Sequence, residues 1–246
     1  MNKKVAYVTG GMGGIGTSIC QQLAKDGFNV VAGCGPNSPR KDRWLQEQKA
    51  LGFDFMASEG NVADWDSTKA AFDKVKAEVG EIAVLVNNAG ITKDGVFKKM
   101  SVEDWKAVID TNLNSLFFVT KQVVDNMMDS GWGRIINISS MNGQRGQFGQ
   151  TNYSTAKAGM HGFTMALAQE VASKGVTVNT ISPGYIGTDM VRAIREDVLE
   201  KIVASIPVRR LGEPGEIASA VSWLASDRAG FTTGANFACN GGNYMG

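Results

Sequence analysis

Cysteine and histidine are scarce in this sequence, and their scarcity argues against two kinds of stabilising site. The three cysteines, Cys20, Cys34 and Cys239, lie far apart without a Cys-x-x-Cys pair, and His161 is the single histidine. Zinc sites and disulfide frameworks both need several such residues at defined spacings. We therefore expect no metal site and no disulfide, and a reducing compartment, the cytoplasm, as the location of the chain.

A surplus of one charge and long apolar runs are also missing. Lys and Arg number 25 against 24 Asp and Glu, a net charge of +1, whereas nucleic-acid binders carry a basic surplus. The apolar run at 5–8 is too short for the core of a signal peptide, and no stretch approaches the roughly 18 apolar residues of a membrane span. We expect neither a nucleic-acid nor a membrane partner, while a local basic patch near a site stays open.

Glycine, in contrast, is abundant, with 30 residues against only five prolines. Many glycines directly follow short apolar runs rich in β-branched residues, which is typical of strands buried on both faces of a sheet. The sequence predicts strands within residues 5–11, 30–35, 53–58, 84–90, 134–139, 180–184 and 236–239.

Segments with the apolar spacing of helices lie between these runs. They cover residues 15–23, 72–79, 102 to about 128, 156–171, 191–203 and 217–224. Because strand and helix alternate, we predict a doubly wound Rossmann-type α/β fold, with a mostly parallel sheet and helices on both faces. Hydrophobic residues make up 43% of the chain and no repeat, linker or charge block divides it, so residues 1–246 are expected to form a single domain.

A glycine-rich loop follows the first predicted strand. It reads Thr9-Gly10-Gly11-Met12-Gly13-Gly14-Ile15-Gly16 and opens the first helix. Glycines let the backbone turn tightly and approach a diphosphate, while the helix N-terminus offers free N–H groups. Such loops also serve as purely structural turns, but the position after the first strand favours nucleotide binding.

The end of the second predicted strand bears on the choice of nucleotide. A site for NAD needs an acidic residue there for the ribose hydroxyls, but residues 33–41 contain no Asp or Glu. Arg40 and Lys41 can instead bind a 2′-phosphate, with Ser38 as a hydrogen-bond donor. We therefore expect NADPH/NADP+ as the cofactor; the alternative is a solvated basic helix start.

Tyr153 and Lys157 face the same side of a predicted helix, one turn apart, with Thr151 or Asn152 as its N-cap. An ammonium group at that distance favours the phenolate and lowers the pKa of the tyrosine from about 10 towards the working pH. Tyr153 can then exchange a proton with a carbonyl oxygen whose carbon receives a hydride. Ser140, at the end of the preceding strand, offers a hydroxyl to the same oxygen. Taken alone, this spacing is common on helix surfaces.

Together these motifs resemble the short-chain dehydrogenase/reductase family over essentially the whole chain. The resemblance rests on the 9–16 loop, Asn87-Asn88-Ala89-Gly90, Asn112, Ser140, Tyr153-x-x-x-Lys157 and Pro183-Gly184. Within the family, the stretches at 6–17, 26–40 and 142–159 are most similar to acetoacetyl-CoA reductases of polyhydroxybutyrate-producing bacteria. The resemblance implies NADPH-dependent reduction of an acyl-CoA thioester, acetoacetyl-CoA. A 3-oxoacyl acyl-carrier-protein reductase and a nucleotide sensor without catalysis are the alternatives.

The resemblance also implies a role for each matched residue. Tyr153 is the acid/base, Lys157 tunes its pKa and binds the nicotinamide ribose, Ser140 is a second donor to the carbonyl, and Asn112 holds a relay water. The other cofactor residues that it implies are Gly10, Met12, Gly13, Gly14, Ile15, Gly16, Gly35, Ser38, Arg40, Gly60, Asn61, Val62, Asn88, Ala89, Gly90, Pro183, Gly184, Ile186 and Thr188. Asn61 stands where the family often has Asp, so adenine binding is expected to differ in detail.

The expected substrate pocket follows Ser140 and Gly184 in the chain. Its expected residues are Asp94, Ser140, Gln147, Phe148, Gln150, Tyr153, Gly184, Tyr185 and Arg195, with Tyr185 and Arg195 as the first choices for the thioester carrier. Residues 185–210 lie between well-predicted elements and are expected to form a mobile lid. Basic residues at 98, 99, 192, 195, 209 and 210 suit either coenzyme A phosphates or an acidic carrier protein, so charge leaves that choice open.

Two further expectations concern residues away from the chemistry. His161 follows Tyr153 by about two helical turns and is interpreted as a packing or interface residue. The segments at 102–128 and 152–172, the latter rich in Ala and Gly, are expected to pack against copies of themselves. The family resemblance implies a homotetramer.

Overall fold

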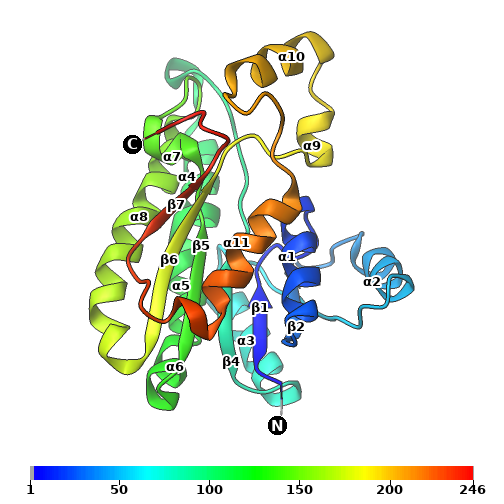
Figure 1. The fold of residues 1–246 in the computed structure, drawn as a ribbon, viewed down its shortest axis with the longest axis vertical. Helices are drawn as coiled ribbons and strands as arrows, with labels where there is room; N and C mark the ends of the chain where they lie inside the picture. Colours follow the sequence, from blue (N-terminus) through cyan, green and yellow to red (C-terminus); the bar gives the residue numbers. More distant parts are fainter. Residues whose placement is uncertain (1–2, 246) are drawn as a thin grey trace.

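Seven strands form one sheet in the computed structural model, which describes residues 3–245 (Figure 1). Their order is β3-β2-β1-β4-β5-β6-β7, and every neighbouring pair is parallel. The strands are β1 Val5–Val8, β2 Asn29–Cys34, β3 Met56–Glu59, β4 Ile82–Asn87, β5 Gly133–Ile138, β6 Val176–Pro183 and β7 Asn236–Cys239. The predicted doubly wound fold with a parallel sheet is confirmed.

Both faces of the central strands are buried, as the β-branched runs of the sequence predict. Every residue of β1, β5 and β6 is buried. The third strand differs from the prediction for 53–58, because it begins only at Met56. Phe53 and Phe55 stack on each other with ring centroids 5.5 Å apart, and Phe55 also stacks on Trp44. Phe55 therefore packs on the helix that precedes it in the chain, and neither ring belongs to the strand.

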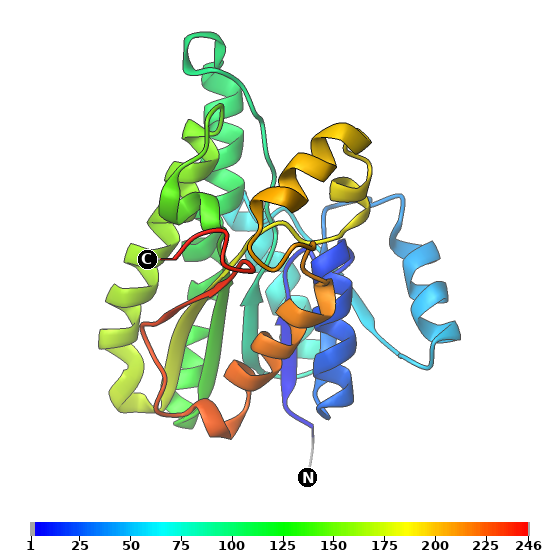
Figure 2. The same ribbon diagram turned by 45° about the horizontal axis from the view of Figure 1, so that its top comes forward.

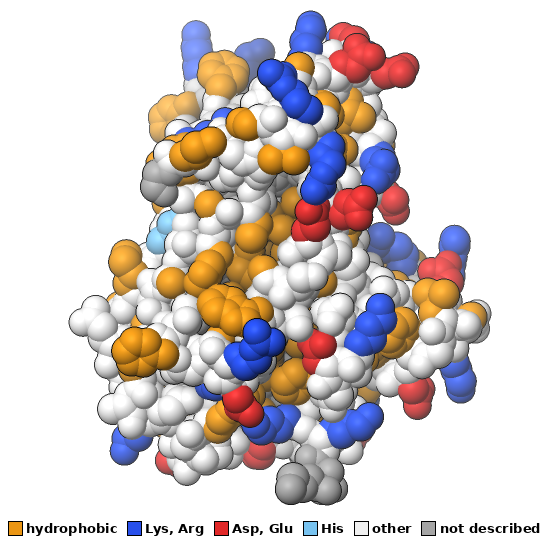
Figure 3. Space-filling view, viewed as in Figure 1, with side chains coloured by type: hydrophobic (Ala, Val, Ile, Leu, Met, Phe, Trp, Pro, Cys, Tyr) orange, Lys and Arg blue, Asp and Glu red, His pale blue; other side chains and the backbone are white. Residues whose placement is uncertain are grey.

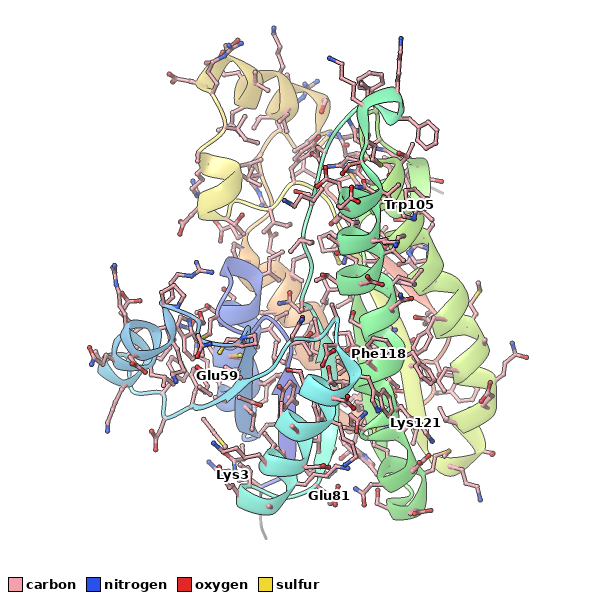
Figure 4. All side chains as sticks on the ribbon, turned by 180° about the vertical axis from the view of Figure 1, so that it is seen from behind. Lys3, Glu59, Glu81, Trp105, Phe118 and Lys121 are labelled. Carbon is pink, nitrogen blue, oxygen red and sulfur yellow. The ribbon has the colours of Figure 1, made fainter. Side chains whose placement is uncertain are left out.

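Helices cover the sheet in two layers, one seen from the front in Figure 1 and one from behind in Figure 4. The front layer packs on Ala6, Val8 and Val84, and the rear layer packs on Tyr7, Leu85 and Ile135. The front helices are α1 Gly14–Lys25, α2 Lys41–Ala50 and α11 Pro214–Ala225; the rear helices are α3 Trp65–Glu78, α4 Val102–Ile109, α5 Ser115–Lys121, α6 Val124–Ser130 and α8 Thr151–Val171.

Three helical segments differ from the sequence prediction. Helix α2 is not among the predicted helical segments, because its residues are mostly polar and only Trp44 and Gln48 are buried. Its start at Lys41 agrees with the alternative interpretation of these basic residues as a helix start. The segment predicted from 102 to about 128 is not one helix: α4 passes through a π-helical turn at Asp110–Asn114 into α5, and α6 begins separately. The segment predicted at 191–203 is divided into α9 Asp189–Arg192 and α10 Glu196–Ser205.

The carboxyl ends of the strands form the edge at which a ligand is expected. Strand order reverses between β1 and β4, and doubly wound sheets bind ligands at such a point. Helices α9 and α10 lie over this edge (Figure 2). The ends of their segment are joined where Gly187 N donates to Gly212 O at 2.8 Å and Gly212 N donates to Tyr185 O at 2.9 Å. Within residues 3–245, the structure contains no helix with the length and apolar character to cross a membrane.

Candidate active site

The glycine-rich loop turns the chain from β1 into α1 with almost no room for side chains. Gly10 has a φ of 61°, and a Cβ on Gly16 would lie 2.2 Å from the Gly10 carbonyl oxygen. A Cβ on Gly14 would lie 2.8 Å from Thr188 Cγ2. Gly13 precedes α1 without a side-chain cap, so the N–H groups of the first turn remain available to a ligand in the cavity that this turn lines.

The end of β4 is fastened to this loop by hydrogen bonds. Asn88 Nδ2 donates to the carbonyl oxygens of Thr9 and Gly10 at 3.0 and 3.1 Å. In return, Thr9 Oγ1 accepts from the backbone N–H groups of Asn88 and Ala89 at 2.9 and 3.0 Å. The two strands on either side of the switch point therefore hold one rigid backbone surface.

A cavity of about 570 Å³ opens on that surface, a size typical of small-molecule sites. Its lining includes eighteen of the predicted cofactor residues: Gly10, Met12, Gly13, Gly14, Ile15, Gly16, Gly35, Ser38, Arg40, Asn88, Ala89, Gly90, Tyr153, Lys157, Pro183, Gly184, Ile186 and Thr188. The sequence reasoning missed Gly33, Cys34, Ile91, Thr92, Ile138, Ser139, Asp189 and Val191. Each of them lies within three residues of a predicted one. Including the neighbours of each motif at the end of its strand would therefore have identified them.

Three predicted cofactor residues, Gly60, Asn61 and Val62, are absent from the described lining of this cavity. They follow β3, and the side-chain oxygen of Asn61 accepts from Ala63 N at 3.1 Å within its own turn. Their assignment to adenine stays a prediction.

The two basic residues proposed for a 2′-phosphate, which follow β2, have different surroundings. Lys41 Nζ lies 2.8 Å from Glu59 Oε1, so an acidic neighbour already compensates its charge. Arg40 lines the cavity with Ser38, and no salt bridge among residues 3–245 includes Arg40. Arg40 is therefore the cation available to an anionic group at this end of the cavity.

Ser140, Tyr153 and Lys157 meet at the other end of the cavity. Lys157 is 3% exposed; its Nζ donates to Ile138 O at 2.8 Å and lies 5.6 Å from the centroid of the Tyr153 ring. Ser140 precedes the short helix α7 Met141–Arg145, and its Oγ accepts from Asn142 N at 3.1 Å. Helix α8 begins at Thr151 with Gln150 as its N-cap, so the predicted N-cap at Thr151 or Asn152 is wrong by one or two residues.

The predicted lowering of the tyrosine pKa is wrong for the structure as it stands. Burial raises the pKa of Tyr153, and a hydrogen bond to Ser140 opposes that rise only in part. Burial also lowers the pKa of Lys157 from 10.5 to about 7, so the lysine is not a full positive charge beside the phenol. A protonated phenol at neutral pH can donate to a carbonyl oxygen, and an amine with a pKa near 7 can pass a proton on.

Asn112 lies outside the cavity wall but next to this group. It belongs to the π-helical turn and is fully buried, and its Nδ2 donates to Ile91 O and Val108 O, both at 2.9 Å. Its Oδ1 has no hydrogen-bond partner among residues 3–245. A Cβ on Gly90 would lie 2.5 Å from this oxygen and 3.5 Å from Lys157 Nζ, so Gly90 keeps the space between the two groups open. Widened helical turns are frequent at functional sites.

The predicted substrate residues fall into separate groups. Gln150 joins Asp94 to the active-site edge, because its Nε2 donates to Asp94 Oδ2 at 2.9 Å and its Oε1 accepts from Asn142 at 3.0 Å. Phe148 is 86% exposed and Gln147 beside it is also exposed. Tyr185 lines a second cavity of about 270 Å³, together with residues that include Ile206 and Val208, and not the larger one.

The four arginines of the 185–212 segment each contact another group of the chain itself. Arg195 pairs with Asp197, and Arg210 forms a two-pronged pair with Glu216 at 2.7 Å. Arg192 Nε donates to Gly187 O at 3.0 Å. Figure 3 shows acidic side chains beside basic ones over this segment, at the upper right. Arg195 is absent from the described lining of both cavities, so its predicted contact with a thioester carrier stays untested.

Fold and site together define a dinucleotide-dependent oxidoreductase. The residues present fit a nicotinamide dinucleotide: a side-chain-free turn ends in free N–H groups, and a buried lysine, a phenol and a hydroxyl converge at the far end of the same cavity. The chain belongs to the short chain dehydrogenase family, whose sequence pattern it matches over residues 4–199.

The relatives that match over the full length include two that are named as reductases. The chain is 76% identical over 246 residues to the acetoacetyl-CoA reductase of Cupriavidus necator, covering all of both chains. It is 60% identical, again over all of both chains, to the nodulation protein G of Azospirillum brasilense. It is 42% identical over 245 residues, all of both chains, to a 3-oxoacyl acyl-carrier-protein reductase of Staphylococcus epidermidis.

Proposed function

We propose that this chain reduces acetoacetyl-CoA to (R)-3-hydroxybutyryl-CoA with NADPH, as a step of polyhydroxybutyrate synthesis. The convergence of Ser140, Tyr153 and Lys157 on one end of a dinucleotide-sized cavity carries the proposal. The identity of 76% to an acetoacetyl-CoA reductase, against 42% to a carrier-protein reductase, supports coenzyme A as the carrier.

The proposed cofactor position follows the lining of the larger cavity. The free N–H groups at the start of α1 face the pyrophosphate, and Asn88, Ala89 and Gly90 form the wall beside the adenosine ribose. Arg40 and Ser38 bind the 2′-phosphate, which distinguishes NADPH from NADH. Pro183, Gly184, Ile186 and Thr188 flank the nicotinamide.

The proposed chemistry is the addition of a hydride and a proton to one carbonyl group. NADPH supplies the hydride, two electrons with one hydrogen, to carbon 3 of the substrate. Tyr153 gives its phenolic proton to the carbonyl oxygen, and Ser140 donates a hydrogen bond to the same oxygen. Lys157 passes the replacement proton to Tyr153 and recovers a proton from solvent through a water that the open oxygen of Asn112 holds. Because the hydrogen bonds from Tyr153 and Ser140 fix the orientation of the carbonyl group, the hydride reaches only one of its faces and one enantiomer forms.

The proposed substrate side lies between residues 90–100 and 184–212. Gln150, held by Asp94 and Asn142, sets the polar wall, while exposed Phe148 and Gln147 meet the acyl-CoA outside it. The 185–210 segment acts as the lid, because its two ends are joined at Gly212 and the helices between them lie over the cavity edge. The proposed location is the cytoplasm, which suits three free cysteines.

The substrate proposal is tested by competition between acetoacetyl-CoA and acetoacetyl-carrier protein at equal concentration, followed by loss of NADPH absorbance. We expect kcat/KM to favour acetoacetyl-CoA, and Tyr153→Phe to lower kcat by roughly 10²–10⁴ while NADPH still binds. A value more than about tenfold higher for the carrier protein would establish the fatty-acid reaction instead. Turnover with neither thioester would favour the nucleotide sensor.

The cofactor proposal is tested by Arg40→Ala. Loss of a charge-assisted contact is expected to raise the KM for NADPH about tenfold or more, while NADH kinetics barely change. Arg43→Ala is the matched control, since Arg43 lies three residues further along in α2, is exposed and pairs with Glu47 at 2.7 Å. Equal losses with both cofactors would make Arg40 a structural residue.

A further inference from the structure

The imidazole of His161 contacts the carboxyl ends of two strands. His161 lies one helical turn after Lys157 on α8, and its Nε2 is 3.1 Å from Ser139 Oγ and 3.4 Å from Ser182 Oγ. Ser139 directly precedes Ser140, and Ser182 directly precedes Pro183. The ring therefore touches the two strand ends that supply both sides of the active site.

The hydrogen positions in this group follow from counting donors. Ser139 Oγ lies 2.8 Å from the carbonyl oxygen of Lys157, which carries no hydrogen, so the serine must donate its single proton there. Ser182 Oγ donates in the same way to Asn236 Oδ1 at 2.7 Å. With both hydroxyl protons committed, the contact to His161 requires Nε2 to be the donor.

The charge of the ring is consistent with that assignment. Burial lowers the pKa of His161 and so favours the neutral imidazole. A neutral imidazole carries one N–H, and here it lies on Nε2 and not on Nδ1.

This donor acts on Lys157 through Ser139. The end of β5 holds Lys157 at two points: Nζ donates to Ile138 O at 2.8 Å, and the backbone carbonyl accepts from Ser139 Oγ. A hydroxyl that accepts a hydrogen bond donates a stronger one, and its rotamer is fixed by having two partners. The N–H of His161 therefore fixes the position of the α8 turn that carries Lys157 relative to the end of β5.

We propose that His161 is a positioning residue, which donates from Nε2 to Ser139 and so holds Lys157 against the end of β5. The inference rests on the proposed function, because it takes Lys157 as the group that binds the nicotinamide ribose and supplies protons to Tyr153. It replaces the interpretation of His161 as a packing or interface residue.

The tautomer is measured without any assay of activity. His161 is the only histidine, so protein labelled with 15N-histidine gives one set of ring signals in long-range 1H–15N correlation spectra. We expect the Nε2–H tautomer with a slowly exchanging proton at neutral pH, and loss of that slow exchange in Ser139→Ala. An Nδ1–H tautomer, or averaged signals in the wild type, overturns the proposal.

Two variants then test the positioning effect, because their amide groups differ only in how far they extend from the backbone. The amide nitrogen of Gln reaches the place of Nε2, whereas that of Asn reaches only the place of Nδ1. We expect His161→Gln to keep the wild-type kcat and Kd for NADPH within about twofold, and His161→Asn to lose about tenfold in kcat and to bind NADPH several-fold more weakly. Equal behaviour of the two variants overturns the proposal.

Thr164→Val separates positioning from general stability. Thr164 is one turn further along α8 and binds Thr180 Oγ1 at 2.7 Å and Asn137 at 2.8 Å, so it fastens the same helix to the same strands away from the site. Its loss is expected to lower Tm without changing kcat. If His161→Asn behaves like this control, His161 is only structural. If acetoacetyl-CoA is not a substrate, the tautomer and the Kd for NADPH still decide the proposal.

Discussion

The position of Lys157 can be predicted from the sequence, but its pKa depends on the surrounding structure. The sequence predicts its place one turn after Tyr153, and the structure has it there. The sequence-based expectation that it acts as a full positive charge is wrong, because the side chain is 3% exposed and burial lowers its pKa to about 7. Burial depends on how α7 and β5 enclose the helix: a Cβ on Gly143 would lie 2.7 Å from the Lys157 backbone. Spacing within one helix does not contain that information.

The lowered pKa of Lys157 predicts a pH dependence of stability. Between pH 7 and about 10, the unfolded chain binds a proton at this lysine that the folded chain does not bind, so the free energy of unfolding must rise with pH. The contribution is at most about 1.4 kcal/mol per pH unit. Urea unfolding at pH 7, 8 and 9 is expected to show this slope in the wild type and its loss in Lys157→Met. Lys106→Met, which removes an exposed lysine of α4, is the control and should keep the slope. Parallel curves for wild type and Lys157→Met would contradict the shift.

At the scale of elements, the sequence predicts those whose apolar pattern is strong. All seven strands were predicted. The central strands are buried on both faces and are continuous apolar runs, and glycine marks many of their ends. Helix α2 was missed because it covers the edge of the sheet and buries few side chains. The π-helical turn at Asp110–Asn114 was missed because its apolar spacing continues that of α4.

The active-site elements were predictable to a similar degree. The glycine-rich loop and Tyr153-x-x-x-Lys157 are contiguous motifs, so their positions at the strand ends follow from the topology. The group around His161 was not predictable, because Ser139, Ser182 and Asn236 come from three different strand ends and no spacing connects them. The same holds for Gln150 with Asp94, which are 56 residues apart in the chain.

At the scale of the whole molecule, the rear helices leave apolar side chains on the surface. Phe117 on α5 is 56% exposed and stacks near Trp65 with ring centroids 6.2 Å apart, and Met165 on α8 is 53% exposed. Figure 4 shows this face, with Phe118 and Lys121 labelled on the same helix as Phe117. The exposed positions of α8 between Thr155 and Ala166 are small or uncharged: Thr155, Ala158, Gly162, Met165 and Ala166. Such a face suits close helix packing between copies of the chain.

We therefore predict a homotetramer in which this rear face is one of the interfaces. Light scattering coupled to size-exclusion chromatography is expected to give four times the mass of the 26.2 kDa chain. Phe117→Lys places a charge in the centre of the apolar face, where it would be buried without a partner, and is expected to give dimers or monomers. Leu51→Lys is the matched control, because Leu51 is 65% exposed after α2 on the other helix layer, and it should leave the mass unchanged. A wild-type mass equal to one chain would rule out the assembly, and a tetramer that persists in Phe117→Lys would move the interface to another face.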